Sequence, residues 1–175
     1  MSSSSWFQEQ ARLGNVFHAC SAGAVTLSTV NATCTGLALS NPFGSGKNLV
    51  VKQVRFAPST APAGVSVVGL SISPAQIETA VTHTTPAVIH NALQFGSDKK
   101  VGVGKVDVSA TLPNTPVWLR PIGGVVAASS IDVGGAYEDD TDGDIILPPG
   151  THLSLSYLTT AAIGIASITW AEVDA

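Results

Sequence analysis

A closely spaced set of carboxylates between Tyr137 and Ile145 is the strongest candidate for metal chemistry in the sequence. Calcium takes about six to eight oxygen ligands, and acidic loops often supply them. The segment does not fit an EF-hand, because Pro149 stands where the bidentate glutamate belongs and no flanking helix is predicted. Two interpretations stay open, a calcium loop of another kind and a solvated acidic turn. The candidate ligands are Glu138, Asp140, Asp142 and Asp144.

The segment Gly44–Lys47 reads Gly-Ser-Gly-Lys, like the end of a phosphate-binding loop. The full motif requires a glycine where this chain has Asn41, and a hydroxyl side chain where it has Asn48. The apolar run that follows predicts a strand, whereas a phosphate site needs the N-terminus of a helix. The segment therefore predicts a hairpin connection between two strands and no bound nucleotide.

Catalytic side chains do not fall into a recognisable spacing. The histidines are scattered, none has a zinc-type spacing with a cysteine, and there is no Gly-x-Ser-x-Gly sequence for a nucleophile. We expect a protein that is not an enzyme and has no cofactor. The four histidines are His18, His83, His90 and His152.

The two cysteines, Cys20 and Cys34, allow at most one disulfide. The sequence begins without a positive cluster followed by an apolar run, so no secretory signal is predicted, and we expect synthesis in the cytoplasm. A cytoplasmic setting keeps thiols reduced. Two buried free thiols are therefore favoured over one bridge, although both remain open.

Short apolar runs separated by Gly, Pro, Asn and Asp predict an all-β fold, an antiparallel β-sandwich. In Thr151–Leu158 the apolar and polar residues alternate, which predicts a strand with one face toward the core. The same alternation places Val54, Phe56, Ile168 and Trp170 inward. Helix is predicted only within Ser73–Phe95, where Pro86 limits it to short pieces.

The chain divides into two parts. Residues 15–175 predict one β-sandwich domain, since about 100–200 residues are usual for a single domain. Residues 1–14 combine a serine run with Trp6 and Phe7 and predict an extended N-terminal arm. Aromatic side chains in a polar arm favour docking, so Trp6 and Phe7 are the candidate interaction residues.

Charge is scarce along this chain. Charged residues make up 11% of the sequence, and none occurs in 13–46 or in 56–77. A soluble globular protein has about 25%. Because interface cores are depleted in charge, these stretches are expected to be buried in the fold or covered by other subunits. The net charge of −4 argues against nucleic-acid binding, and no apolar run is long enough to predict a membrane span.

Two regions, 35–64 and 146–173, resemble small β-rich virion proteins of tailed bacteriophages and prophages. The first contains a strand, Asn-Pro, Gly-x-Gly and a second strand, and the other is similar to the closing strands of those proteins. The resemblance implies a jelly-roll-like sandwich and a capsid decoration or cement protein. It also implies binding to the major capsid protein, assembly as a homotrimer and a place on the capsid surface of the virion.

The alternative is a receptor-binding or carbohydrate-binding β module of a phage tail or fibre. In that case the acidic segment would hold calcium, and the protein would be present in few copies per particle. The two hypotheses predict the same fold class and differ in copy number and in the bound partner.

Overall fold

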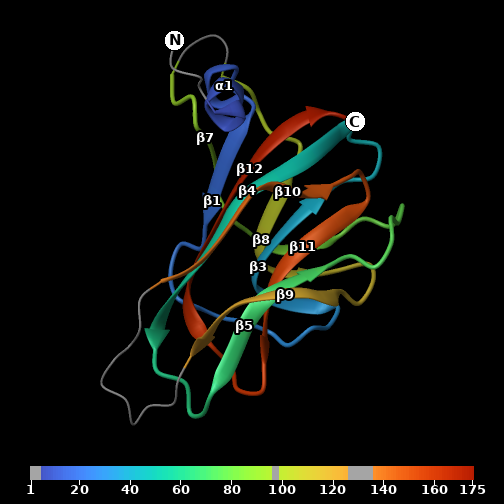
Figure 1. Cartoon of the computed structure of the whole chain (residues 1–175). Coiled ribbons are helices and arrows are strands. Elements are labelled where there is room, and N and C mark those ends of the chain that lie inside the picture. Colours follow the sequence, from blue (N-terminus) through green and yellow to red (C-terminus); the bar gives the residue numbers. More distant parts are fainter. Residues whose placement is uncertain (1–4, 96–98, 126–135) are drawn as a thin grey trace.

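The chain folds into two antiparallel β-sheets that pack against each other, so the predicted β-sandwich is confirmed (Figure 1). The computed structural model describes residues 5–95, 99–125 and 136–175. The more specific jelly-roll connectivity stays a prediction. The described termini of the chain, near α1 and at the end of β12, lie toward the same end of the sandwich.

Among the described residues, sheet A has six strands, five of which follow one another in the order β10-β4-β12-β1-β7. The sixth strand, β2, pairs with the beginning of β12. The long central pair β4–β12 extends from Ile163 opposite Thr60 to Asp174 opposite Lys47. The strands of sheet A are β10 (Tyr137–Leu147), β4 (Lys47–Thr60), β12 (Ile163–Asp174), β1 (Val16–Cys20), β7 (Ile89–Asn91) and β2 (Val25–Thr26).

In the part of the chain that the structure describes, sheet B also has six strands, in the order β6-β8-β3-β11-β5-β9. Regions 35–64 and 146–173 of the sequence pair with each other in both sheets, as β3 with β11 and as β4 with β12. They form one structural unit at the centre of the sandwich. The strands of sheet B are β6 (Thr82–Pro86), β8 (Lys105–Thr111), β3 (Thr33–Asn41), β11 (Thr151–Leu158), β5 (Ser66–Ile72) and β9 (Val117–Val125).

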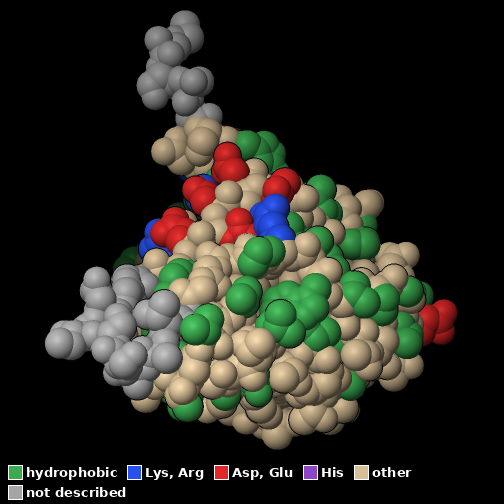
Figure 2. Space-filling view, turned by 60° about the horizontal axis from the view of Figure 1, so that its bottom comes forward, with side chains coloured by type: hydrophobic (Ala, Val, Ile, Leu, Met, Phe, Trp, Pro, Cys, Tyr) green, Lys and Arg blue, Asp and Glu red, His purple; other side chains and the backbone are tan. Residues whose placement is uncertain are grey.

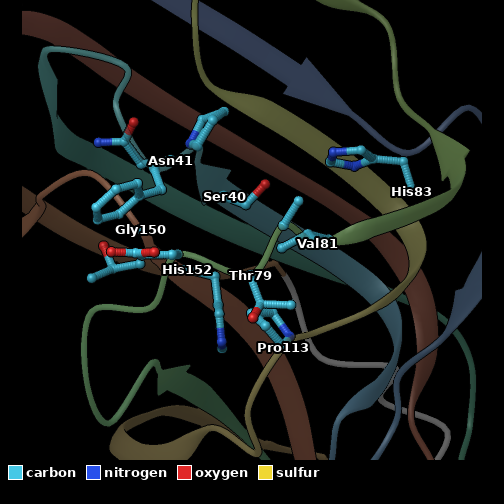
Figure 3. Close-up of a pocket in the computed structure, with 13 residues that line it drawn as sticks. Ser40, Asn41, Thr79, Val81, His83, Pro113, Gly150 and His152 are labelled. Carbon is cyan, nitrogen blue, oxygen red and sulfur yellow. The ribbon is translucent and has the colours of Figure 1, made fainter.

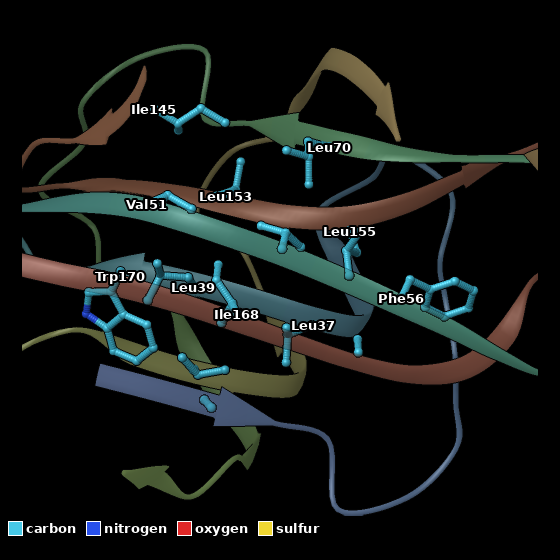
Figure 4. Packing of buried hydrophobic residues seen from close by; sticks show 14 of the residues in the cluster. Leu37, Leu39, Val51, Phe56, Leu70, Ile145, Leu153, Leu155, Ile168 and Trp170 are labelled. Atoms are coloured by element: carbon cyan, nitrogen blue, oxygen red, sulfur yellow. The ribbon is translucent and has the colours of Figure 1, made fainter. Parts of the chain in front are cut away.

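The core lies between the sheets and consists of the inward-facing apolar residues of their strands (Figure 4). Trp170 is fully buried, and its ring stacks on Phe17 of the neighbouring strand with 5.8 Å between the ring centroids. Leu153 and Leu155 of β11 complete the core from sheet B. The other inward positions predicted from the alternation are also buried: Val54, Phe56 and Ile168.

Two predictions about local structure are wrong. The helix predicted within Ser73–Phe95 is absent, and that segment contains the short strands β6 and β7. The connection Pro42–Gly46 is not a hairpin, because β3 belongs to sheet B and β4 to sheet A. Asn41 fixes this crossover, since its Nδ2 donates to the carbonyl oxygens of Lys47 and Leu147 at 2.7 and 2.8 Å.

The described part of the chain contains one helix, α1 (Trp6–Arg12), on the outer face of sheet A. Among the described residues, no helix combines the length and the apolar character that crossing a lipid bilayer requires.

Candidate functional site

The acidic segment forms the edge strand β10 of sheet A, so the prediction of an acidic turn is wrong. Its register with β4 shifts between Asp140 and Ile145. At this bulge Asp142 and Gly143 have φ angles of 43° and 99°, in the left-handed region that favours glycine. The candidate calcium ligands are divided among different basic partners: Glu138 pairs with Arg55, Asp140 and Asp142 with Lys52, and Asp144 with Arg120.

Each carboxylate of β10 pairs with a basic side chain from a neighbouring strand. We call this set the ion-pair cluster. Figure 2 shows the charged side chains gathered toward one part of the surface, next to a broad area with almost none. The pairs are Glu138–Arg55 at 3.0 Å, Asp139–Arg120 at 2.7 Å, Asp140–Lys52 at 3.7 Å, Asp142–Lys52 at 3.3 Å and Asp144–Arg120 at 3.0 Å.

Arg120 joins the two sheets within the ion-pair cluster, because it lies on β9 of sheet B and its carboxylate partners lie on β10 of sheet A. Its hydrogen bonds to Asp144 and Asp139 raise the pKa of the guanidinium group. No three carboxylate, imidazole or thiol groups of the described residues are grouped so that they could hold a metal ion. The calcium hypothesis therefore gains no support from the geometry of β10.

The N-terminal segment does not form the predicted extended arm over residues 6–12, and residues 1–4 lie outside the described part. A capping box explains helix α1: Ser5 Oγ accepts from the backbone N–H of Gln8, and Gln8 Oε1 accepts from that of Ser5. Phe7 of α1 is buried against Val16 and Val50 of sheet A in the same chain. Trp6 is 47% exposed, so docking on a partner stays a prediction and only Trp6 has the accessible ring for it.

The edge strand β9 exposes three consecutive large apolar residues, Val117, Trp118 and Leu119, at 38–47% of their surface. We call these residues the β9 edge. Within the described residues β9 forms a strand ladder with β5 alone. Its contacts with β10, at Arg120 and Gly124, leave residues 117–119 exposed. Pro121 on the same strand is typical of an edge strand. An open edge with apolar side chains is a surface on which another chain can pack.

The outer face of sheet A carries a polar hollow of about 330 Å³ that the sequence did not reveal. We call it the histidine hollow. His18 of β1 lies directly opposite His90 of β7. The Nδ1 atom of His18 is 2.9 Å from Oγ1 of Thr169 on β12. Burial, and next the charge of His90, lower the pKa of His18. The lining includes His18, Cys20, Gln53, Arg55, His90 and Thr169.

Both cysteines are free thiols, as favoured from the sequence, but only one is buried. Cys20 is exposed because it lies on the open outer face of β1, which corrects the expected burial. Cys34 is buried beneath the segment before β6, and this burial raises the pKa of its thiol to about 11.

A second pocket, of about 170 Å³, lies at the outer side of sheet B between the start of β11 and the segment before β6 (Figure 3). His83 lies at one end and Gly150 at the other. His83 Nδ1 is 2.6 Å from Oδ2 of the buried Asp107. Burial lowers the pKa of His152 to about 4, and its Nε2–H donates to Asn114 Oδ1 at 2.7 Å.

His83 and Asp107 are arranged like the general base of a catalytic triad and the carboxylate that orients it. A triad also needs a nucleophile. Among the described residues, no serine or cysteine makes a hydrogen bond to His83. The Gly-Ser-Gly-Lys segment adds no phosphate site, because Ser45 Oγ donates to Asn41 Oδ1 and Lys47 pairs with Asp174.

The fold and these surfaces define a β-sandwich protein with one edge closed by ion pairs and an open apolar strand beside them. A comparison with known protein families, characterised proteins and solved structures finds no match to this chain.

Proposed function

We propose that this chain is a non-enzymatic structural protein of a phage virion, a capsid decoration or cement protein. It binds across junctions between major capsid protein subunits on the capsid surface and stabilises the head. The resemblance of regions 35–64 and 146–173 to virion proteins leads to this class of function. The exposed β9 edge of sheet B supplies the physical support.

The observation that carries the proposal is the β9 edge, an exposed apolar edge of sheet B, whose strands contain few charges. Within the described residues its strands contain Lys105, Asp107 and Arg120 as their charged side chains, and Asp107 is buried. Arg120 is held by the ion-pair cluster. A surface of this composition loses little hydration free energy when a partner covers it, because few charges must be desolvated.

The mechanism is the addition of many weak contacts. A stable protein interface buries about 1,200–2,000 Å², and a small domain that lies across a junction can share that area between two shell subunits. Repetition over the shell, and within a homotrimer, then raises the overall affinity through multivalency. The net charge of −4 gives no attraction to the packaged nucleic acid, so the partner is protein.

The first test is the protein content of purified particles of the phage or prophage that encodes the chain. Quantitative mass spectrometry is expected to find many copies per particle, in proportion to the major capsid protein. Absence from the particle would overturn the proposal. Presence in only a few copies would overturn the capsid position and favour the tail or fibre module.

The second test examines the β9 edge by co-sedimentation with capsids that lack the protein. Leu119→Asp places a charge in the contact and is expected to lower the fraction bound by about tenfold, which corresponds to roughly 1.4 kcal/mol. Val88→Asp is the matched control, because Val88 is 69% exposed and precedes β7, the edge strand of sheet A farthest in the strand order from β10. Equal binding of both variants and the unmodified chain would exclude the β9 edge as the contact. Sedimentation equilibrium tests the homotrimer separately.

A further inference from the structure

We propose that His18 and His90 form a binding site for a divalent transition-metal ion, of the Zn²⁺, Ni²⁺ and Cu²⁺ class, in the histidine hollow. The site lies on the outer face of sheet A, away from the β9 edge. It is separate from the proposed capsid role and from the acidic strand that the sequence suggested for calcium. Four features of the hollow support it.

The first feature is the register of the two strands. His18 of β1 and His90 of β7 are direct partners in an antiparallel pair, and Figure 1 shows the two strands side by side. Directly opposed residues point to the same face of a sheet, with Cα atoms about 5.5 Å apart in a hydrogen-bonded pair. Both side chains line the same hollow. Two imidazole rings at this spacing can direct one nitrogen each toward a common ion.

The second feature is the contact between His18 and Thr169. The Nδ1 atom of His18 is 2.9 Å from Thr169 Oγ1, on the strand that flanks β1 on its other side. When Nδ1–H donates to this hydroxyl oxygen, the proton is absent from Nε2, whose lone pair is then free. A metal-binding histidine usually donates its second ring nitrogen to such an acceptor, which fixes both the tautomer and the ring orientation.

The third feature is the electrostatic setting. Arg55 lines the hollow, but its guanidinium group pairs with Glu138 at 3.0 Å. Gln53 also donates to Glu138, which keeps this carboxylate beside the arginine. Among the described lining residues, Arg55 is the one permanent cation, and its charge is balanced. An incoming divalent cation therefore meets little net repulsion.

The fourth feature is the space around the rings. The hollow of about 330 Å³ is open to solvent, and the exposed thiol of Cys20 lies two residues from His18 on the same face of β1. Two protein ligands leave the remaining coordination positions to water. Imidazole nitrogen suits zinc, nickel and copper, whereas calcium and magnesium prefer oxygen ligands. Copper(II) is expected to bind most tightly, following the usual order for divalent ions.

The test is isothermal titration calorimetry of the whole chain, prepared without a polyhistidine tag, with ZnCl₂, NiCl₂ and CuCl₂ in separate titrations. One ion per chain is expected, together with no heat from CaCl₂. His18→Ala and His90→Ala are each expected to weaken binding at least about tenfold, because a single imidazole remains. Thr169→Val removes the acceptor for Nδ1–H and is expected to weaken binding about tenfold.

Two further variants serve as controls. His83→Ala removes a histidine outside the hollow and is expected to leave the affinity unchanged. Cys20→Ser is expected to change it by less than about threefold if water fills the remaining positions. Each variant is checked by its thermal transition, which exposed positions on one strand face should preserve. The proposal is overturned if the unmodified chain binds no metal at millimolar concentration. Equal binding by the His18→Ala, His90→Ala double variant would overturn it as well.

Discussion

The outer faces of the two sheets differ in the solvent exposure of their polar side chains. On sheet A, His18, Gln53 and Arg55 line an open hollow. On sheet B, the polar residues of β11 and β5 are almost completely buried, although they face away from the core. The buried set is Ser71, His152, Ser154 and Ser156, each 0–1% exposed.

The difference comes from what lies over each face. Helix α1 covers one end of sheet A, where Phe7 packs on Val50. Sheet B is covered by the segment before β6, in which Val81 packs on Cys34 and Ala38. The covered hydroxyls are satisfied by one another, since Ser71 Oγ lies 2.9 Å from Ser154 Oγ and 2.8 Å from Ser156 Oγ. The comparison shows that alternation identifies the core side of a strand but not whether its other side meets water.

The largest loss of stability is expected when the packing of helix α1 on sheet A is removed. Phe7→Ala should lower the free energy of unfolding by about 3 kcal/mol, the usual cost of deleting a buried aromatic ring. Trp6→Ala is the matched variant in the same helix. Because Trp6 is 47% exposed, it should change stability by no more than about 0.5 kcal/mol.

Urea denaturation followed by tryptophan fluorescence or circular dichroism measures both variants. Near-equal losses for Phe7→Ala and Trp6→Ala would mean that α1 does not anchor on sheet A through Phe7. A Trp6 variant that is stable but assembles poorly would support the predicted docking of the N-terminal segment on a partner.

The second prediction concerns the buried face of sheet B and its response to acid. Burial lowers the pKa of His152 to about 4 in the folded chain, while its value in the unfolded chain is about 6.5. The unfolded state therefore binds more protons between these two values. Stability is complete above about pH 6.5 and falls as the pH drops toward 4, by about 2–3 kcal/mol in all.

Unfolding free energies measured from pH 7 to pH 4 check this expectation, with His152→Gln as the comparison. The glutamine variant is expected to start lower, because a buried group is replaced, but to lose less stability across that window. Glu78 lines the same pocket, so the Glu78→Gln variant isolates the contribution of that carboxyl group. The same slope in the unmodified chain and in His152→Gln would contradict the assignment.

The sandwich, the inward residues of its strands and the free thiols could be predicted from the sequence, because turn residues and alternation are local signals. Whether the outer face of a sheet is covered depends on segments that are distant in the sequence, so no local pattern predicts it. Glu172 illustrates this: it stands in an apolar strand, yet its carboxylate accepts from the backbone N–H groups of Val103 and Gly104 at 2.8 and 2.9 Å.

The candidate sites were harder to predict than the fold. The acidic residues read as a turn because they are close in sequence, but their basic partners Lys52, Arg55 and Arg120 come from other strands. His18 and His90 became a pair only through the register of β1 and β7. The segment 6–12 read as an arm because its helix depends on a capping box and on one buried ring, which are weak sequence signals.

The smallest effect is expected at the link between the two sheets. Arg120 makes ion pairs across the edge with Asp139 and Asp144, but its side chain is 35% exposed and water weakens the interaction. Arg120→Ala should therefore lower the free energy of unfolding by only about 1 kcal/mol. The loss should shrink at high salt, since screening weakens exposed pairs.

Arg12→Ala is the matched control, because Arg12 pairs with Glu9 within one helix and links no sheets. Its effect on the free energy of unfolding should be smaller than that of Arg120→Ala at every salt concentration. A loss at Arg120 that exceeds about 3 kcal/mol and does not depend on salt would mean that the pair behaves as a buried one. The edge between β9 and β10 would then depend mainly on Arg120. The apolar contacts between β9 and β5 would contribute less to the stability of that edge.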